Sequence, residues 1–194
     1  LAFDLSDAGL SLCILDSGAG HADLTDEYAA ITKEMKAISR LLGKEFLREV
    51  AEEDFVAAIP MLREKVGDRA VLRALHFFAD NERVPQQVAA LRAGDFDRFL
   101  DLVNASGRSS WVYLQNVVPA GYKEHQEVAL TLALCAALLD GRGASRVHGG
   151  GFAGTVQAFV PFDLLDKFIA GTEAVLGKGA CHVLSIRPVG GMQF

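Results

Sequence analysis

The stretch Ser145–Val156 reads SRVHGGGFAGTV and places four glycines within six positions, between two segments rich in β-forming residues. Glycine has no Cβ, so such a backbone takes positive φ angles and approaches a ligand closely. Its successive N–H groups are then able to face an anion such as a phosphate. Hairpin turns and bulges also concentrate glycine, and by itself the stretch favours a plain turn.

The composition is that of a folded globular protein. Of the 194 residues, 51% are apolar and 23% are charged, which suits a well-packed core in one large or two small domains. The net charge is −6 and no basic run interrupts the mixed charges, so we expect neither nucleic acid nor anionic membranes as partners. The longest apolar run, Val128–Leu139, is too short to cross a bilayer.

Cysteine and histidine usage indicates neither a disulfide framework nor a metal centre. The three cysteines are odd in number and widely spaced, and we expect reduced thiols in the core. His21, His76 and His148 lack carboxylates or cysteines at ligand spacing, so no metal site is expected. No signal peptide is visible, although the chain does not open with methionine. These features predict a cytoplasmic protein.

Hydrophobic periodicity predicts alternating helices and strands. Helices are expected at residues 25–42, 52–66, 68–93, 95–105, 122–139 and 162–176. Strands are expected twice within residues 1–16, and at 145–148, 155–160 and 182–187. Pro60 should break or kink the second helix, and Pro85 should kink the third. Residues 111–118 fit a strand or an extended loop, and the pattern does not separate the two.

The order of these elements predicts one α+β domain over residues 1–194. The outer elements follow the order strand, helix, strand, glycine loop, strand, helix, strand, with a helical block between residues 52 and 105. Such an order suits an antiparallel sheet that is backed by helices.

Five segments together resemble a known family of enzymes. GGGFAG at 149–154 resembles the third signature, GGGFGG, of the GHMP small-molecule kinases, with Ala153 replacing a glycine. The other four are SGAGH at 17–21 followed by Glu27-Tyr28, LGKEFLREV at 42–50, RALH at 73–76 and DNERV at 80–84. They are similar, in the same order, to segments of the galactokinase family, and the resemblance extends from Asp16 to Val160.

The resemblance implies the C-terminal domain of a GHMP kinase, which is ferredoxin-like and carries extra helices in galactokinases. The family's N-terminal G-E-H-T-D motif, its P-x-x-x-G-L-S-S-S-A phosphate loop and its M-D-Q stretch with the catalytic aspartate are not found in the chain. We therefore expect an N-terminal domain of the parent protein to supply the catalytic aspartate, the Mg²⁺ ligands and the phosphate loop. No catalytic or metal-binding residue is assigned to this chain, which is expected to be inactive alone.

The implied activity is that of an ATP-dependent sugar 1-kinase, galactokinase, with a sugar, ATP and the N-terminal domain as partners. Tyr28 matches the family tyrosine that hydrogen-bonds a sugar hydroxyl, and a phenol both donates and accepts; the alternative is a tyrosine that only packs at a helix start. Phe152 should wedge the loop against the core, and Ala153 is strained if its position requires positive φ. The nucleotide is expected to be lined by Gly149, Gly150, Gly151, Phe152, Ala153 and Gly154.

The chain departs from the family pattern after Ser106. Galactokinases read E-S-H-x-S-L and then an acidic stretch, whereas here Gly107 replaces the histidine and residues 110–122 contain no such stretch. The identity of the sugar is therefore open. A second function also stays open, namely a galactokinase-like sensor of sugar and ATP that binds a regulatory partner without catalysis.

Overall fold

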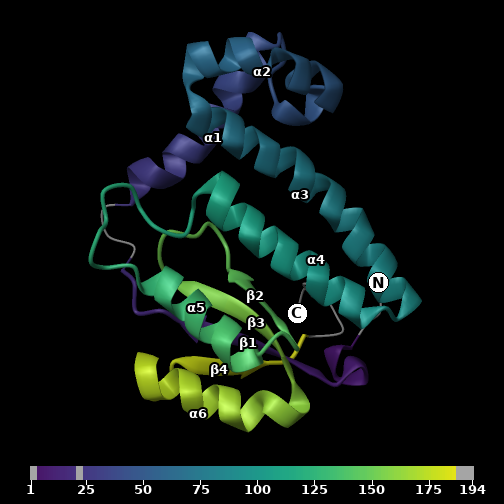
Figure 1. The fold of residues 1–194 in the computed structure, drawn as a ribbon, viewed down its shortest axis with the longest axis vertical. Coiled ribbons are helices and arrows are strands. Elements are labelled where there is room, and N and C mark those ends of the chain that lie inside the picture. The colour runs from purple at the N-terminus through teal and green to yellow at the C-terminus, as the bar shows by residue number, and fades with distance from the viewer. Residues whose placement is uncertain (1–3, 21–23, 187–194) are drawn as a thin grey trace, which may run out of the picture.

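Six α-helices and four β-strands make up the part of the chain that the computed structural model describes, residues 4–20 and 24–186 (Figure 1). The strands are β1 (Leu10–Asp16), β2 (Ala144–Val147), β3 (Thr155–Pro161) and β4 (Cys181–Leu184). The helices are α1 (Thr25–Leu41), α2 (Glu52–Val66), α3 (Asp68–Ala93), α4 (Phe96–Ser109), α5 (Glu127–Leu139) and α6 (Leu165–Leu176). Short 3₁₀ turns are η1 (Leu5–Ala8), η2 (Leu47–Glu49) and η4 (Phe162–Leu164), and η3 (Ser110–Leu114) is a π-helical turn.

The four strands form one antiparallel sheet in the order β2-β3-β1-β4. Cys13 in β1 lies opposite Ala158 in β3 and Val183 in β4, which fixes the faces to which the side chains alternate. A β-α-β-β-α-β order with the first and third strands at the centre is the ferredoxin-like arrangement. The predicted α+β fold, an antiparallel sheet backed by helices, is confirmed.

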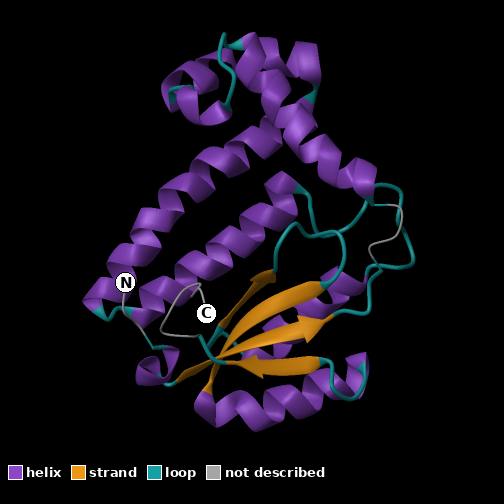
Figure 2. Ribbon diagram, turned by 180° about the vertical axis from the view of Figure 1, so that it is seen from behind, coloured by secondary structure: helices purple, strands orange, loops and turns teal. Residues whose placement is uncertain are grey.

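Helices α5 and α6 cover one face of the sheet, and Figure 2 shows the strands in front of α5 when the molecule is seen from behind. Cys13 and Leu15 from β1, Val156 and Val160 from β3, and Phe168 from α6 are completely buried between them. Alternate residues of β1 and β3 point to this face, because successive side chains of a strand point to opposite sides of the sheet.

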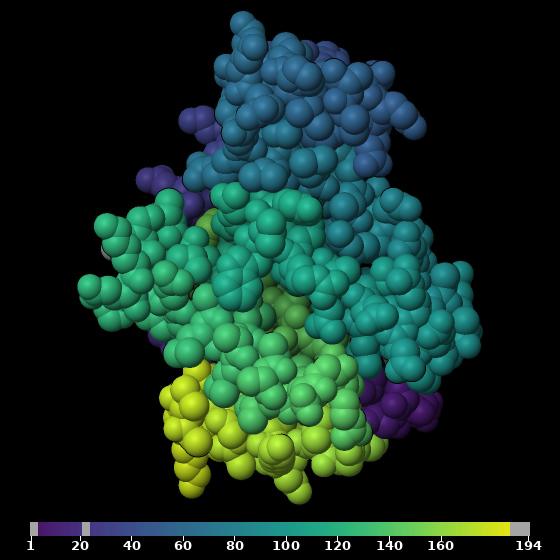
Figure 3. Space-filling model, in the orientation of Figure 1, coloured from purple at the N-terminus to yellow at the C-terminus, as the bar shows by residue number. Residues whose placement is uncertain are grey.

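A second core lies in a lobe of helices away from the sheet. Ile38 of α1, Phe55 and Leu62 of α2, and Ala74 and Phe78 of α3 form it. Figure 3 shows this lobe, in blue, standing above the rest of the molecule. Helix α3 runs from the lobe down to α4, which packs on the sheet, so the predicted helical block is present (Figure 1). Within the described residues, no helix is both long and apolar enough to cross a membrane.

Both internal prolines lie inside continuous helices, so the break expected at Pro60 does not occur. Pro60 and Pro85 are exposed. Val56, four residues before Pro60, is also exposed, so water is able to solvate the carbonyl that loses its helical partner. Phe55 and Leu62 are buried on either side of Pro60 and hold the helix in place.

Other element boundaries also differ from the sequence-based expectations. The expected first strand is a 3₁₀ turn at Leu5–Ala8, because the Asp4 side chain accepts a hydrogen bond from the Ser6 N–H and favours a turn. Residues 111–118 are neither a strand nor a simple extended loop, since they begin in the π-helical turn. The last strand is Cys181–Leu184, and the predicted end at Arg187, like Phe3, lies outside the described residues.

A buried polar network joins α3, α4 and β2. The His76 ring nitrogen Nδ1 lies 2.9 Å from the Ser109 hydroxyl, and the Ser106 hydroxyl donates to Asp80 at 2.7 Å. Arg146 of β2 in turn donates to Ser106 at 2.7 Å. A Cβ at Gly107 would lie 2.9 Å from the carbonyl oxygen of Ser145 and 3.0 Å from Cβ of Arg146. The close approach of α4 to β2 therefore accounts for a glycine at position 107.

The buried ring of His76 predicts a pH-dependent stability. Burial lowers the pKa of His76, so the unfolded chain binds a proton below about pH 6.5 that the folded chain binds only at lower pH. The free energy of unfolding should therefore fall as the pH drops from 7.5 to 5.5. Urea unfolding at both pH values should show that the free energy of unfolding falls less for His76→Gln than for the unsubstituted protein. The control His125→Gln alters an exposed ring and should keep the full drop; equal drops in all three proteins would contradict this assignment.

Candidate functional site

The glycine loop, residues 148–154, connects β2 to β3 at one end of the sheet (Figure 1). The His148 N–H donates to the Thr155 carbonyl at 2.9 Å and closes the base of the loop. Gly149, Gly151 and Gly154 have φ of +69°, +83° and +78°. Left-handed backbone at these three positions explains why the chain requires glycine in the loop.

The loop residues that take positive φ differ in two respects from those considered in the sequence analysis. Phe152, not Ala153, takes positive φ, at +59°. Ala153 is therefore not strained in this way, and it is 2% exposed in a small cluster with Leu24 and Phe152. Gly150 also lies outside the left-handed region. Burial of the Phe152 ring, which wedges the loop against Leu24, offsets the strain of its backbone.

Tyr28, from the first turns of α1, contacts the centre of the loop. Its hydroxyl donates to the carbonyl oxygen of Gly151 at 2.8 Å. Its ring packs edge-to-face on Phe152 with 5.4 Å between centroids, and it lies 2.9 Å from where a Cβ of Gly150 would stand. Burial raises the pKa of the Tyr28 phenol, so the group stays a hydrogen-bond donor at neutral pH. The structure thus brings together the two elements that the sequence assigns to the site.

The segment after β1 forms hydrogen bonds with Gly154, the last glycine of the loop. The Ser17 N–H donates to the Gly154 carbonyl at 3.0 Å, and the Gly154 N–H donates to the Ala19 carbonyl at 3.3 Å. The SGAGH motif and the glycine loop, which share the family resemblance, are therefore in contact. His21 lies outside the described residues.

Asn116 is a functional candidate that the sequence reasoning missed. Its side-chain Nδ2 donates to the carbonyl oxygen of Gly150 at 3.1 Å, and its own carbonyl accepts the N–H of Phe152. A Cβ at Gly151 would overlap the Asn116 carbonyl. Asn116 lies within residues 110–122, where the sequence departs from the family, and that departure was the available signal.

Three successive loop amides have no hydrogen-bond partner among the described residues. The N–H groups of Gly149, Gly150 and Gly151 make no hydrogen bond to any residue of the described ranges 4–20 and 24–186. Successive N–H groups in a backbone that alternates between left-handed and other conformations form a concavity that binds anions. The loop is therefore suited to a phosphate.

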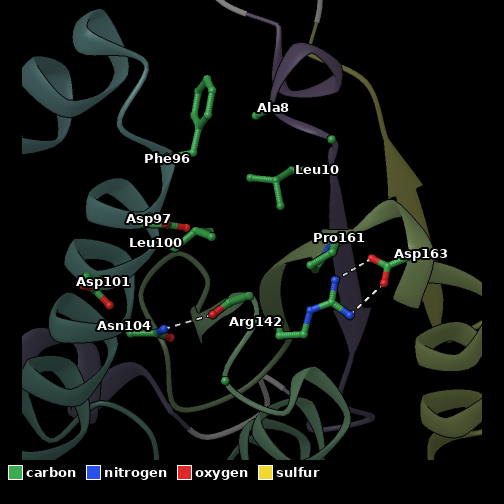
Figure 4. A pocket seen from close by; sticks show the side chains of 13 residues that line it. Ala8, Leu10, Phe96, Asp97, Leu100, Asp101, Asn104, Arg142, Pro161 and Asp163 are labelled. Atoms are coloured by element: carbon green, nitrogen blue, oxygen red, sulfur yellow. Dashed lines mark hydrogen bonds and ion pairs between the residues drawn. The ribbon is translucent and has the colours of Figure 1, made fainter.

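Two cavities lie at opposite ends of the sheet. A cavity of about 290 Å³ lies beside the glycine loop against Phe152 and Tyr122. A cavity of about 600 Å³ lies at the other end, between α4 and the start of β1 (Figure 4). There Arg142 is held by Asp163 through hydrogen bonds of 2.7 and 2.9 Å. Because the glycine loop does not line the larger cavity, the candidate site lies at the loop end.

Comparison with known proteins finds galactokinases, although no family model matches the chain. Galactokinase of Homo sapiens is 34% identical over 150 residues, covering 77% of this chain and 35% of the human protein. Galactokinase of Streptomyces coelicolor is 30% identical over 196 residues, covering 98% of this chain and 47% of that protein. The chain spans less than half the length of these curated relatives.

A solved structure shares the fold. The crystal structure of Lactococcus lactis galactokinase complexed with galactose superposes with a TM-score of 0.67 at 24% identity, over 91% of this chain and 45% of that chain. The alignments in sequence extend over most of the chain, and they agree with the ferredoxin-like sheet and its added helices. The chain belongs to the galactokinase family.

Proposed function

We propose that residues 1–194 act as the C-terminal domain of an ATP-dependent sugar 1-kinase of the galactokinase type, which phosphorylates the anomeric hydroxyl of galactose or a related sugar. One observation carries the proposal. Tyr28, which we assign to the sugar, and the glycine loop, which we assign to the nucleotide, are joined by the hydrogen bond from Tyr28 to Gly151.

The geometry suits a reaction that depends on positioning. In this proposal the phosphates of ATP lie against the N–H groups of Gly149–Gly151, and Phe152 and Ala153 support the loop from within the core. Tyr28 binds the sugar next to these phosphates, because its phenol can accept a hydrogen bond as well as donate one. Phosphoryl transfer requires little covalent chemistry from the protein, so holding the two substrates together supplies much of the catalysis.

The remaining machinery is assigned to an N-terminal domain. Among the described residues, no three His, Cys, Asp or Glu side chains are grouped so that they could hold a metal ion. We therefore place the Mg²⁺ ligands in that domain, together with the catalytic aspartate and the phosphate loop. Mg²⁺, when bound, neutralises charge on the phosphates. Residues 1–194 are proposed to be one domain of this enzyme, inactive alone.

We propose a cytoplasmic enzyme whose partners are small molecules and its own N-terminal domain. Cys13, Cys135 and Cys181 are all unpaired, as is usual for a reducing compartment. The net charge of −6 disfavours binding to nucleic acid or to an anionic membrane, because like charges repel.

A sensor of sugar and ATP without catalysis is the second candidate. The departure at residues 106–122 favours it, because this segment holds the loop through Asn116 and yet differs from the family pattern. A sensor needs the ligand contacts of Tyr28 and the glycine loop but not the catalytic aspartate. The residue in the M-D-Q stretch of the parent protein distinguishes the two candidates.

The 194-residue chain alone should bind ATP weakly, with a Kd on the order of 1 mM, because the loop supplies only backbone donors. Amide resonances of Gly149, Gly150 and Gly151 should shift during an ATP titration followed by NMR. No phosphorylation of galactose should be measurable. Micromolar affinity for ATP in calorimetry, or an ATP response that leaves these three amides unmoved, would argue against the proposed nucleotide contact.

Tyr28→Phe in the intact protein should impair sugar use specifically. The substitution keeps the ring against Phe152 and removes the hydroxyl. We expect kcat/KM for the sugar to fall by a factor that corresponds to about 1 to 2 kcal/mol of transition-state stabilisation, as for the loss of one hydrogen bond. The KM for ATP should change less. Steady-state kinetics and thermal melting test this; a lower Tm with unchanged kinetics would show that Tyr28 serves packing alone.

A further inference from the structure

We infer that Asn116 is a positioning residue, which fixes the glycine loop in the orientation that offers its N–H groups to a phosphate. This inference rests on the proposed function and adds a residue to it. Asn116 comes from the connection between η3 and α5, which is distant in sequence from the loop.

Asn116 holds two consecutive peptide groups of the loop. Its Nδ2 binds the carbonyl oxygen of Gly150 at 3.1 Å, and its carbonyl binds the N–H of Phe152. A peptide group is planar and trans, so its C=O and N–H point in opposite directions. When Asn116 holds the Gly150 oxygen, the N–H of Gly151 must point away from Asn116.

The next peptide is fixed in the same manner. Tyr28 holds the carbonyl oxygen of Gly151 at 2.8 Å, while the Phe152 N–H of that peptide points back to Asn116. Gly151 has no side chain because one would overlap the Asn116 carbonyl. Hydrogen bonds therefore hold both central peptides of the loop. The orientation of the N–H groups of Gly149, Gly150 and Gly151 is then fixed before a ligand binds.

The buried side chain of Asn116 lowers the stability of the fold. The residue is 2% exposed, and its Oδ1 has no hydrogen-bond partner in the described part of the chain. A buried acceptor without a partner destabilises a protein, whereas an apolar side chain of the same shape avoids that cost. Stability alone thus does not account for asparagine here, and its hydrogen bond to Gly150 does.

Asn116 is itself rigidly held. The π-helical turn η3 is followed by Gln115, which has φ of +57°, and the N–H of Gln115 donates to the Ser110 carbonyl at 2.8 Å. Two residues before Asn116, the carbonyl of Leu114 accepts from the buried guanidinium of Arg73 at 3.1 Å. The side chain is therefore a fixed support for the loop.

Asn104 provides a matched control at the opposite end of β2. Its Nδ2 also donates to a glycine carbonyl, that of Gly143, at 3.1 Å. Unlike Asn116, its Oδ1 has a partner, the N–H of Ser145 at 3.2 Å. Leucine, which is close to asparagine in shape, is the substitution for both positions.

In the intact protein, Asn116→Leu should weaken ATP binding about three- to tenfold while Tm stays unchanged or rises. Asn104→Leu should lower Tm and leave ATP affinity unchanged. Calorimetry and thermal melting measure the two effects. The amide resonances of Gly149, Gly150 and Gly151 should broaden or multiply in Asn116→Leu without ATP, which a purely structural role does not predict.

The outcomes separate this inference from the proposed function. If ATP does not shift the loop amides of the unsubstituted protein, the proposed function fails. If ATP shifts them and Asn116→Leu binds ATP with unchanged affinity, only the role of Asn116 is overturned. Should Asn116→Leu fail to fold, Asn116→Asp keeps the shape and removes the donor, and unchanged ATP affinity in that variant overturns the inference equally.

Discussion

The buried ion pair of Arg73 joins the two supports of the glycine loop. Arg73 is 1% exposed and donates to Glu34 of α1 at 2.9 Å and to the Leu114 carbonyl at 3.1 Å. Helix α1 carries Tyr28, and Leu114 lies two residues before Asn116. Loss of one partner of a buried pair typically costs about 3 to 5 kcal/mol. The position of the loop amides therefore depends on a charge pair whose atoms lie in other elements.

Sequence reasoning was sufficient wherever the determining forces are local. The apolar run at residues 10–15 predicted a strand, and the order of elements predicted a sheet backed by helices; β1 and its packing against helices bear out both. Glycine at 149 and 151 predicted left-handed backbone, which both residues adopt. Tyr28 and the glycine loop were assigned to one site through the family resemblance, and the structure places them in contact.

The rest depends on contacts that no local pattern encodes. Positive φ at Phe152 is tolerated because its ring is buried against Leu24, a neighbour distant in sequence. Position 107 requires a glycine because the backbone of β2 lies too close for a side chain. The helix stays continuous at Pro60 because its neighbours pack in the helical lobe. Asn116 was missed because only the folded chain brings its amide to Gly150. Pairwise fit between distant segments decides each of these features.

Departures from local rules gather around the loop. Phe152 has left-handed backbone, and Gln115 has it in the adjoining segment. Asn116, next along the chain, has a buried side-chain oxygen with no hydrogen-bond partner within residues 4–20 and 24–186. Asp140 also has positive φ, but it ends a helix, where this conformation is common. A plain hairpin turn requires none of the other three, since a short glycine turn forms without support. Strain that persists because surrounding contacts enforce it is typical of a site built for a ligand.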